Sequence, residues 1–355
     1  SRPPGRESRS RSPGVARGQL HRTGPSIPLR MNFRSIDDLN RAVVALLPRI
    51  PRDVDLVVGI PRSGLLAASM IALHMNRPLT DLRGLLERRL LQSGKRRAED
   101  SVVDPFETAR RVLIVDDSVR SGAALREARA SLEAEDLPWP LTFAAIYVTP
   151  EARDLPDLFA EEVPLPRMFA WNVMHHAWLA KCCVDLDGVL CRDPEPDEND
   201  DGPRYEEFLA NTEPLLLPTV PIGWIVTARL EKYRALTEAW LARHGVTYER
   251  LVMLDLPDAA TRRRTGAHVP HKVDAYRRFR GMLFIESCPD QARHIAEQSG
   301  RPVLCATTQD MCYPRSIAGN AAAVARKFGS SWVRTLEGAS QRLFDGLLAR
   351  KRAQL

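Results

Sequence analysis

Two adjacent carboxylates follow a strand of the buried type in the first half of the chain. The range 112–115 is an unbroken β-branched and aliphatic run, as expected for a strand covered on both faces of a parallel sheet, and Asp116 and Asp117 come directly after it. A short loop with a Ser-Gly step and a predicted helix over 123–132 follow. Such a loop gathers backbone N–H groups and the positive end of a helix dipole, which favours a phosphate, while the acids suit hydroxyl groups or a metal ion. A plain strand–turn–helix with two solvated acids would have the same pattern.

A second strand–loop–helix precedes this one along the chain. An apolar strand is predicted over 55–60 and an Ala-, Leu- and Met-rich helix over 65–75, with the sequence Pro-Arg-Ser-Gly at 61–64 between them. An arginine beside a Ser-Gly step suits a second anionic group. The alternative is an ordinary turn with a surface arginine. Its position about one strand–helix unit before the acid pair favours the functional interpretation.

The stretch 111–125 resembles the 5-phosphoribosyl 1-pyrophosphate (PRPP) signature of type I phosphoribosyltransferases, which has four apolar residues, two acids and a loop with a Thr/Ser-Gly step. The resemblance implies that the acids bind the ribose 2′- and 3′-hydroxyls and that the following loop binds the 5′-phosphate. It also implies a pyrophosphate site in the 61–64 loop, which in this family often contains an unusual peptide bond. Ala124 stands where the family usually has Thr or Ser, so Arg120 is expected to supply charge in place of the missing hydroxyl. The implied PRPP-binding residues are Arg62, Ser63, Gly64, Asp116, Asp117, Arg120, Ser121, Gly122, Ala123 and Ala124.

Two further segments of the first half have roles that the sequence leaves open. The long basic connection 79–104 contains Lys95, Arg96 and Arg97, and a connection of this length is usually functional or mobile. By the same resemblance it is the loop that closes over pyrophosphate, and otherwise it is a solvated charge run. The segment 164–178 is expected to form either an acceptor pocket or a packed hinge to the next domain. Its aromatic and polar residues are Trp171, Asn172, His175, His176 and Trp178.

The second half has acids spaced two residues apart. The sequence Val-Asp-Leu-Asp-Gly at 184–188 is a strand that leads into Asp185 and Asp187, and it resembles motif I of the haloacid-dehalogenase (HAD) superfamily. Residues that resemble the other three motifs follow in order along the chain. They are Thr227 after a strand over 222–226 for motif II, Lys272 for motif III, and Glu286 or Asp290 for motif IV.

This resemblance implies the chemistry of a Mg²⁺-dependent phosphatase. Asp185 would attack phosphorus and form an aspartyl-phosphate, and Asp187 would protonate the leaving oxygen and later activate water. An acid rather than an apolar residue at 187 favours a phosphatase over a dehalogenase. Thr227 and Lys272 would bind the phosphoryl oxygens. The implied Mg²⁺ ligands are Asp185, the carbonyl of Asp187, and Glu286 or Asp290.

The length of 355 residues favours two domains. The predicted fold class is α/β, with a mostly parallel sheet flanked by helices in each domain. By resemblance these are a type I phosphoribosyltransferase fold and a HAD-like Rossmannoid fold with a minimal cap. The expected divisions are a disordered Arg/Ser/Pro-rich tail over 1–30, a transferase domain over 31–178, a phosphatase domain over 179–318 and a helical segment over 319–355.

The net charge of +6 comes from the first thirty residues, which hold seven Arg and one Glu. The remainder is balanced, so no nucleic-acid surface is expected on the folded body. No apolar run of about 18 residues exists, so we expect a cytoplasmic protein without membrane insertion. The six cysteines lack paired metal-ligand spacing, and those around Asp185 are predicted to be core residues. The oligomeric state does not follow from the sequence.

A transferase and a phosphatase in one chain suggest consecutive reactions. The first site would attach ribose 5-phosphate from PRPP to an acceptor with release of pyrophosphate, and the second would remove the 5-phosphate. The chain resembles the fused enzymes that install β-ribofuranose in bacterial polysaccharides, with a glycan hydroxyl as acceptor. Only about forty residues separate motifs I and II, too few for a large cap, which suits a bulky substrate. The alternatives are a nucleobase acceptor, giving a nucleoside, and a PRPP-sensing regulator without turnover, which the missing hydroxyl at Ala124 would favour.

Overall fold

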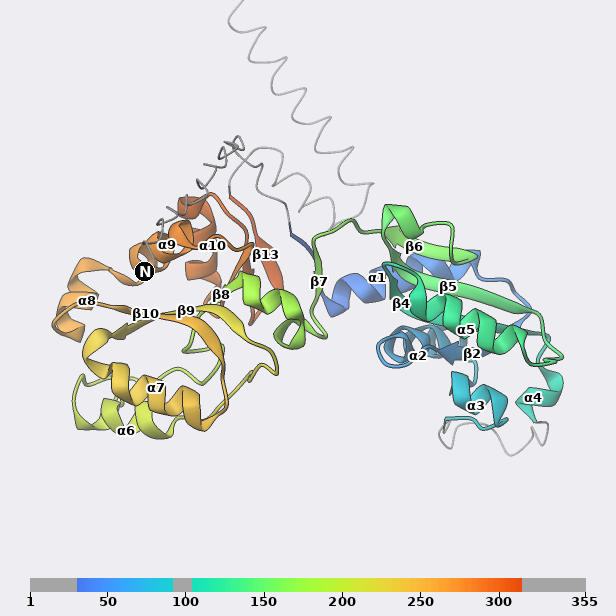
Figure 1. The fold of residues 1–355 in the computed structure, drawn as a ribbon, viewed down its shortest axis with the longest axis horizontal. Coiled ribbons are helices and arrows are strands. Elements are labelled where there is room, and N and C mark those ends of the chain that lie inside the picture. The colour runs from blue at the N-terminus through green and yellow to red at the C-terminus, as the bar shows by residue number, and fades with distance from the viewer. Residues whose placement is uncertain (1–30, 92–103, 315–355) are drawn as a thin grey trace, which may run out of the picture.

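The strands of the protein form two large sheets and one small one. The computed structural model describes residues 31–91 and 104–314, and Figure 1 shows the two large sheets in separate lobes. The predicted tail over 1–30, the basic residues Lys95, Arg96 and Arg97, and the predicted helical segment over 319–355 lie outside the described residues. The predicted fold class, α/β with mostly parallel sheets flanked by helices, is confirmed.

The first lobe is built on a five-stranded parallel sheet of order β3-β2-β4-β5-β6. The apolar runs identified in the sequence form the central strands of this sheet, where helices cover both faces. The strands are β2 (Val54–Gly59), β3 (Leu79–Asp81), β4 (Arg111–Val119), β5 (Leu141–Val148) and β6 (Leu158–Glu162).

Strand β4 continues four residues past the predicted end at 115. It lies between β2 and β5, and its second half keeps pairing with β5, with Asp116 opposite Ala145 and Val119 opposite Val148. Asp116 and Asp117 therefore belong to the strand rather than to the loop after it. Successive residues of a strand point to opposite faces, so the two carboxylates leave the backbone in different directions.

Helices cover both faces of this sheet. Helix α1 (Ile36–Leu46) begins at Ser35, whose hydroxyl accepts from Asp38 N–H in a capping box. With α2 (Gly64–Met75) it packs on one face, and α5 (Ala123–Glu133) packs on the other. The predicted long connection 79–104 is partly regular, since it begins with β3 and a short helix. The short helices are α3 (Leu82–Leu86) and α4 (Pro105–Thr108), and the 3₁₀ turns η1 (Leu47–Arg49) and η2 (Pro150–Ala152) complete this lobe.

The second lobe is built on a six-stranded sheet of order β10-β9-β8-β11-β12-β13. Its strands are parallel except β13, which pairs antiparallel with β12 and forms an edge hairpin that the sequence did not predict. Cys182 and Cys183, in β8, are fully buried, as expected for core cysteines. The strands are β8 (Cys182–Val184), β9 (Ile222–Leu230), β10 (Tyr248–Leu254), β11 (Leu283–Glu286), β12 (Val303–Cys305) and β13 (Asp310–Cys312).

The helices of the second lobe also lie on both faces of its sheet. Side chains of α9 and α10 share an apolar cluster with Val226 and Phe284, and Trp240 of α7 lies in the cluster of the opposite face. The helices are α6 (Pro203–Asn211), α7 (Arg234–Arg243), α8 (Ala259–Thr265), α9 (His268–Arg278) and α10 (Pro289–Ser299), with the 3₁₀ turn η5 (Glu231–Tyr233) before α7.

A small two-stranded sheet joins the lobes. Strand β1 (Asn32–Arg34) pairs parallel with β7 (Arg167–Phe169), and the chain then continues through the 3₁₀ turns η3 (Val173–His175) and η4 (Ala177–Lys181) into β8. Figure 1 shows this segment between the two lobes. Phe169 belongs to the core of the first sheet, and the other buried apolar side chains of this segment pack into the core of the second. These side chains are Met31, Phe33, Met168, Met174 and Leu179.

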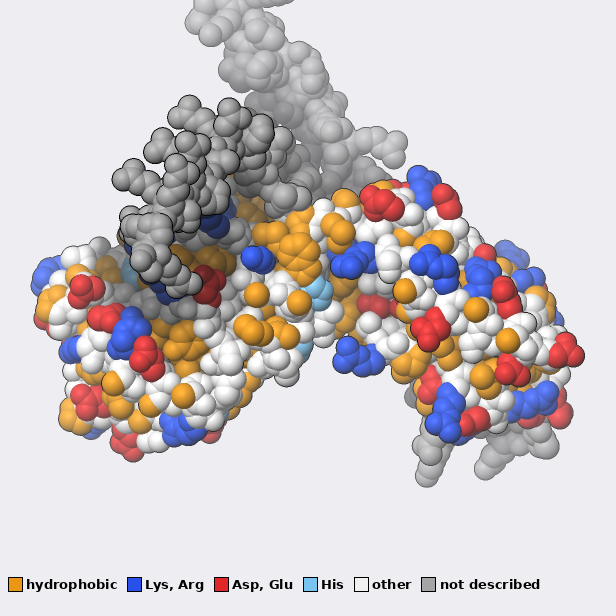
Figure 2. All heavy atoms as spheres, in the orientation of Figure 1, with side chains coloured by type: hydrophobic (Ala, Val, Ile, Leu, Met, Phe, Trp, Pro, Cys, Tyr) orange, Lys and Arg blue, Asp and Glu red, His pale blue; other side chains and the backbone are white. Residues whose placement is uncertain are grey.

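The visible surface is mixed in charge. Figure 2 shows acidic and basic side chains interspersed over both lobes on the face that it presents. No helix within 31–91 and 104–314 has both the length and the apolar character needed to cross a bilayer.

Candidate functional site

The acid pair of β4 meets two segments that are distant in the sequence. The Ser63 hydroxyl donates to Asp117 Oδ1 at 2.7 Å, and Trp171 Nε1–H donates to Asp117 Oδ2 at 3.1 Å. Asp116 Oδ1 accepts from the backbone N–H of Asp117 at 2.9 Å. The 61–64 loop and the 164–178 segment therefore converge on one carboxylate, at the carboxyl edge of the parallel sheet.

Close approach of α2 to β4 depends on Gly64. A Cβ at this position would lie 2.7 Å from the carbonyl oxygen of Val115 and 3.3 Å from Asp116 Oδ1, closer than side chains tolerate. The peptide bond between Pro61 and Arg62, in the same loop, is cis. The glycine thus lets the 61–64 loop lie directly against the acid pair.

One of the two acids, Asp116, has an unusually high pKa. Burial, followed by repulsion from Asp117, raises the pKa of Asp116 to about 7. No described lysine or arginine forms an ion pair with either carboxylate, since both accept only from neutral groups. Two hydroxyl donors or a cation would therefore complete the hydrogen bonding and charge of the pair.

The predicted phosphate loop leads into α5 without a side-chain cap. Gly122 precedes the helix with φ of 75°, and a Cβ there would collide with the Leu155 side chain at 2.2 Å. Because no side chain caps this helix, N–H groups of its first turn remain available to an anion. Ser121 Oγ accepts from Ala123 N–H at 3.4 Å, and the role expected of Arg120 in place of the hydroxyl missing at Ala124 stays a prediction.

A cavity of about 190 Å³ opens beside the acid pair. Of the predicted PRPP-binding residues it is lined by Ser63, Asp117 and Arg120, whereas Arg62, Gly64, Asp116 and residues 121–124 do not line it. Arg167 also lines it and was missed from the sequence, although an arginine between Pro166 and Met168 in an apolar stretch was a usable signal. The remaining lining residues are Ser118, Leu165, Phe169, Asn172, His176 and Trp178.

Arg167 and His176 give this cavity a basic wall. Arg167 is buried over the ring of Phe169, and burial lowers its pKa to about 10. His176 Nδ1 accepts from the backbone N–H of Trp178 at 3.2 Å, which leaves the proton of the neutral ring on Nε2. Burial and then Arg120 lower the pKa of His176, so at neutral pH its ring is a hydrogen-bond donor rather than a cation.

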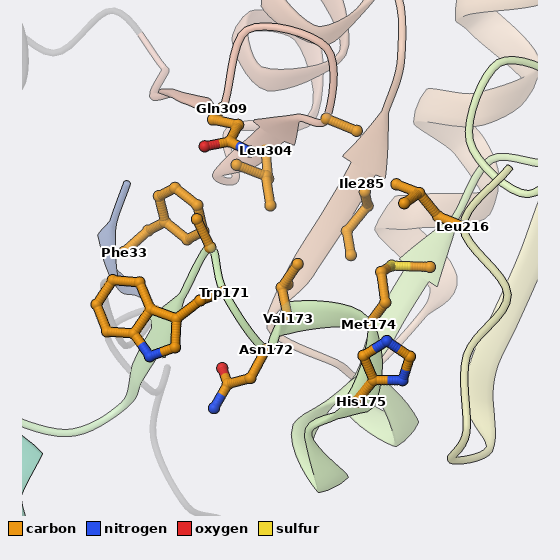
Figure 3. Close-up of a pocket in the computed structure, with 12 residues that line it drawn as sticks. Phe33, Trp171, Asn172, Val173, Met174, His175, Leu216, Ile285, Leu304 and Gln309 are labelled. Atoms are coloured by element: carbon orange, nitrogen blue, oxygen red, sulfur yellow. The ribbon is translucent and has the colours of Figure 1, made fainter. Parts of the chain in front are cut away.

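A second cavity, of about 170 Å³, lies between the lobes (Figure 3). Figure 3 shows Phe33 and Trp171 on one side and Ile285, Leu304 and Leu216 on the other. The 164–178 segment therefore lines a cavity and contacts both lobes, and its role as an acceptor pocket or as a hinge stays a prediction.

In the second lobe, one lysine bridges two buried carboxylates. Lys272 Nζ lies 2.7 Å from Asp185 Oδ2 and 2.7 Å from Glu286 Oε2, and it also contacts Gln291 Oε1 at 3.0 Å. Burial and the neighbouring Glu286 raise the pKa of Asp185, and the two carboxylates raise the pKa of Lys272. The predicted motif I, III and IV residues thus meet at the carboxyl ends of β8 and β11.

Asp187 is paired with a buried arginine, Arg229, which was not predicted from the sequence. Arg229 is fully buried, and its Nε and Nη2 atoms donate to the Asp187 carboxylate at 2.6 to 3.1 Å. Thr227, two residues earlier, is buried and its hydroxyl accepts from Arg229 N–H at 3.1 Å. Thr227 does not line the cavity described below, although its neighbour Ala228 does. The sequence Thr-Ala-Arg at the end of a strand was the available signal for Arg229.

The structure separates the two candidates for motif IV. The Glu286 side chain is buried beside Lys272, whereas the Asp290 side chain is 76% exposed on α10 and pairs with Arg293. Asp290 therefore lies in the exposed first turn of a helix, so of the two predicted alternatives Glu286 is the one that lies beside Lys272 and Asp185. Ser287 Oγ donates to the Asp187 carbonyl at 3.4 Å, which places this carbonyl beside Glu286.

The oxygen atoms of this site suit Mg²⁺, but they come from only two carboxylates and one backbone carbonyl. Two carboxylates, Asp185 and Glu286, and the carbonyl of Asp187 are hard oxygen ligands of the kind that Mg²⁺ prefers. Within the described ranges no three His, Cys, Asp or Glu side chains stand together as a metal-binding group. A bound ion would therefore use a backbone oxygen and displace Lys272 from at least one carboxylate.

A cavity of about 340 Å³ opens over these acids. The short insert between motifs I and II lines it with Asp193, Pro194 and Asn199. The insert is anchored by Asp201, which accepts from Ala259 N–H at 2.9 Å and pairs with Lys232 at 3.0 Å. The short insert is therefore a wall of the cavity that Asp201 holds in place. The other lining residues are Asp185, Asp187, Tyr205, Ala228, Arg262, His268, Lys272, Glu286, Ser287, Cys288 and Gln291.

Comparison with known proteins gives a similarity of fold in part of the chain. No family model and no curated protein matches the sequence. Among solved structures, the Helicobacter pylori xanthine-guanine-hypoxanthine phosphoribosyltransferase is 17% identical, with a TM-score of 0.32, over 41% of this chain and 95% of that chain. A Pyrococcus horikoshii purine phosphoribosyltransferase is 16% identical, with a TM-score of 0.29, over 40% and 93%.

A hypothetical protein from Neisseria gonorrhoeae with bound ppGpp is also similar. It is 18% identical, with a TM-score of 0.30, over 41% of this chain and 90% of that chain. Similarities this weak carry no functional argument, so the function must be argued from the residues of the two sites.

Proposed function

We propose that the protein is a bifunctional enzyme. Its first site transfers the 5-phosphoribosyl group of PRPP to an acceptor with release of pyrophosphate, and its second site removes the 5-phosphate from the product. The transferase site belongs to the five-stranded sheet and the phosphatase site to the six-stranded sheet. The observation that carries the proposal is that each sheet gathers acids and anion-binding groups, from loops far apart in the sequence, at the carboxyl ends of its strands.

At the first site, the residues divide between the two ends of the donor. Asp116 and Asp117 accept from the ribose hydroxyls, and the uncapped start of α5 binds the 5′-phosphate with Arg120 nearby. The 61–64 loop and Arg167 face the pyrophosphate. Lys95, Arg96 and Arg97 remain proposed pyrophosphate ligands on the basis of the family resemblance.

At the second site, Asp185 is the nucleophile and Asp187 the general acid and base. Lys272 neutralises the phosphoryl oxygens after it leaves one of its carboxylate partners, and Thr227, within β9, supplies a hydroxyl. Mg²⁺, held by Asp185, Glu286 and the Asp187 carbonyl, would act as a Lewis acid toward the phosphoryl group. Arg229 fixes the orientation of the Asp187 carboxylate.

A glycan hydroxyl is the proposed acceptor, and the product is a β-ribofuranosyl residue. The support is that the anchored insert lines the phosphatase cavity without covering it with a separate cap domain, which leaves room for a bulky substrate. The localisation that fits PRPP as donor is the cytoplasm.

The test is incubation of the full chain with PRPP, Mg²⁺ and a panel of glycans and nucleobases, followed by mass spectrometry. We expect a glycan heavier by one ribose and release of pyrophosphate and phosphate. A ribosylated base would replace the glycan acceptor in the proposal. Absence of pyrophosphate release with every acceptor would exclude the transferase reaction.

A further inference from the structure

The phosphatase cavity contains a buried arginine without a counter-charge. Arg262, on α8, is only 5% exposed and lines this cavity. Its Nη1 donates to the Ala228 carbonyl at 2.8 Å and its Nη2 to Asn199 Oδ1 at 3.3 Å, while its buried Nε has no partner. All of these contacts are to neutral groups, and no described carboxylate forms an ion pair with Arg262.

The other two buried cations of this region are different. Lys272 pairs with Asp185 and Glu286, and Arg229 pairs with Asp187. Burying an unpaired charge is unfavourable, so an arginine kept in this state in a cavity wall indicates a ligand that brings the missing negative charge.

The surroundings of Arg262 hold it in place. The insert residue Asp201 accepts from Ala259 N–H at the start of α8, and Asn199 of the same insert contacts the guanidinium. Ala228, whose carbonyl accepts from Arg262, directly follows the proposed phosphoryl-binding Thr227. The arginine therefore lies at the border of the phosphoryl site, between that site and the insert.

A neighbouring histidine makes this border suitable for an anion. His268, which lines the same cavity, has its pKa lowered to about 4, first by burial and then by Arg262 and Lys272. Its ring is neutral at pH 7 and can donate a hydrogen bond. Asp193 also lines the cavity, but among the described residues no ion pair joins it to Arg262.

We propose that Arg262, with Asn199 and His268, forms a subsite for a second anionic group of the substrate whose phosphomonoester is hydrolysed at Asp185. This inference rests on the proposed phosphatase function. The group is a phosphate or a carboxylate, since both accept the two-pronged hydrogen bonding of a guanidinium. In the sequential scheme it belongs to the acceptor, which is therefore an anionic molecule.

The experiment compares pairs of phosphomonoesters that differ by one anionic group. Glycerol 3-phosphate and 3-phosphoglycerate test a carboxylate. Ribose 5-phosphate and ribose 1,5-bisphosphate, with formation of ribose 1-phosphate followed by mass, test a phosphate. For each protein the ratio of kcat/KM within a pair is measured, and this ratio does not depend on the fraction of active enzyme.

We expect the wild-type enzyme to prefer the anionic member of at least one pair, by roughly 10- to 100-fold. Arg262→Gln should abolish this preference, and Arg262→Lys should retain part of it. Arg263→Gln is the matched control, since it removes the same charge from the next, exposed residue and should keep the wild-type ratio. If the Gln variant does not fold, the Lys variant and His268→Gln, both expected to reduce the ratio several-fold, carry the test.

Three results would overturn the inference. Equal hydrolysis of both members of each pair by the wild-type enzyme would show that no second anion is bound. A uniform loss of activity in Arg262→Gln, with an unchanged ratio, would assign the arginine to the transferred phosphoryl group or to structure. Failure to hydrolyse any of the four esters in the presence of Mg²⁺ would instead reject the phosphatase function itself, and the subsite with it.

Discussion

The two proposed sites handle their acids in opposite ways. In the first, Asp116 and Asp117 are adjacent in one strand and accept hydrogen bonds only from neutral groups, Ser63, Trp171 and the backbone. In the second, Asp185 and Asp187 are two residues apart, and each pairs with a buried cation, Lys272 or Arg229. The acids of the first pair therefore have no ion-paired cation among the described residues, whereas each acid of the second pair has one.

This difference has a physical consequence. Without a counter-cation, burial and mutual repulsion raise the pKa of Asp116 to about 7, so the first site is incomplete until a ligand brings donors. In the second site the cations fix the orientation of the carboxylates before any substrate binds, as expected for a group that must attack in a defined direction. We therefore expect a bound ligand to complete the surroundings of the first acid pair, whereas the protein's own side chains already hold the second pair in place.

The largest expected effect is in the second site. Asp185→Asn keeps the shape of the side chain but removes the nucleophile, so phosphatase activity should fall by roughly 10⁴-fold or more. The variant should accumulate acceptor–ribose 5-phosphate, one phosphate heavier than the wild-type product, while pyrophosphate release continues. Asp290→Asn, an exposed acid of the same region, is the control and should behave as wild type. An unchanged rate of dephosphorylation in Asp185→Asn would remove the second site from the scheme.

The next effect concerns the first site alone. Replacing Asp116 and Asp117 together by Asn removes the charged acceptors proposed for the ribose hydroxyls, so PRPP-dependent transfer should fall by roughly 10²- to 10³-fold. Hydrolysis of a simple phosphomonoester should persist, because the phosphatase residues lie on the other sheet. Transfer at the wild-type rate by the double variant would show that these acids do not bind ribose.

The pairing of buried acids with Lys272 in the second site can be tested by measuring the stability of variants. Lys272→Met leaves Asp185 and Glu286 buried without their cation, which should lower the free energy of unfolding by roughly 3–5 kcal/mol. Lys232→Met removes a partly exposed lysine paired with Asp201 and should cost less than about 1 kcal/mol. Denaturant unfolding measures both, and equal effects of the two substitutions would contradict the contrast drawn between the sites.

The absence of a counter-cation in the first site predicts a pH dependence. Because the folded-state pKa of Asp116 lies above its usual value, its contribution to stability is present at low pH and is lost as the pH rises toward and through about 7. Asp116→Asn removes this loss. The free energy of unfolding of the variant relative to wild type should therefore rise by roughly 2–3 kcal/mol between pH 5 and pH 8. A constant difference across this range would mean that the carboxyl group titrates normally.

The sequence by itself determined the features that depend on neighbours in the chain. Unbroken apolar runs predicted the central strands, and Ser35 predicted the start of α1. The strand before Asp185 predicted that this acid lies at a sheet edge. These signals are local, because strand burial and helix capping involve residues within a few positions. The resemblance to the HAD motifs also predicted that Asp185 and Lys272 meet an acid at position 286 or 290.

The tertiary structure decided the features that depend on packing between distant segments. The pairing of Trp171 with Asp117 and of Arg229 with Asp187, and the unpaired state of Arg262, follow from which loops reach the same cavity. The choice of Glu286 over Asp290 has the same origin, since four positions along the chain separate the end of a buried strand from the exposed start of a helix. Side-chain type specifies what a group can bind, but only the folded chain fixes the distance, burial and counter-charge that decide what it does bind.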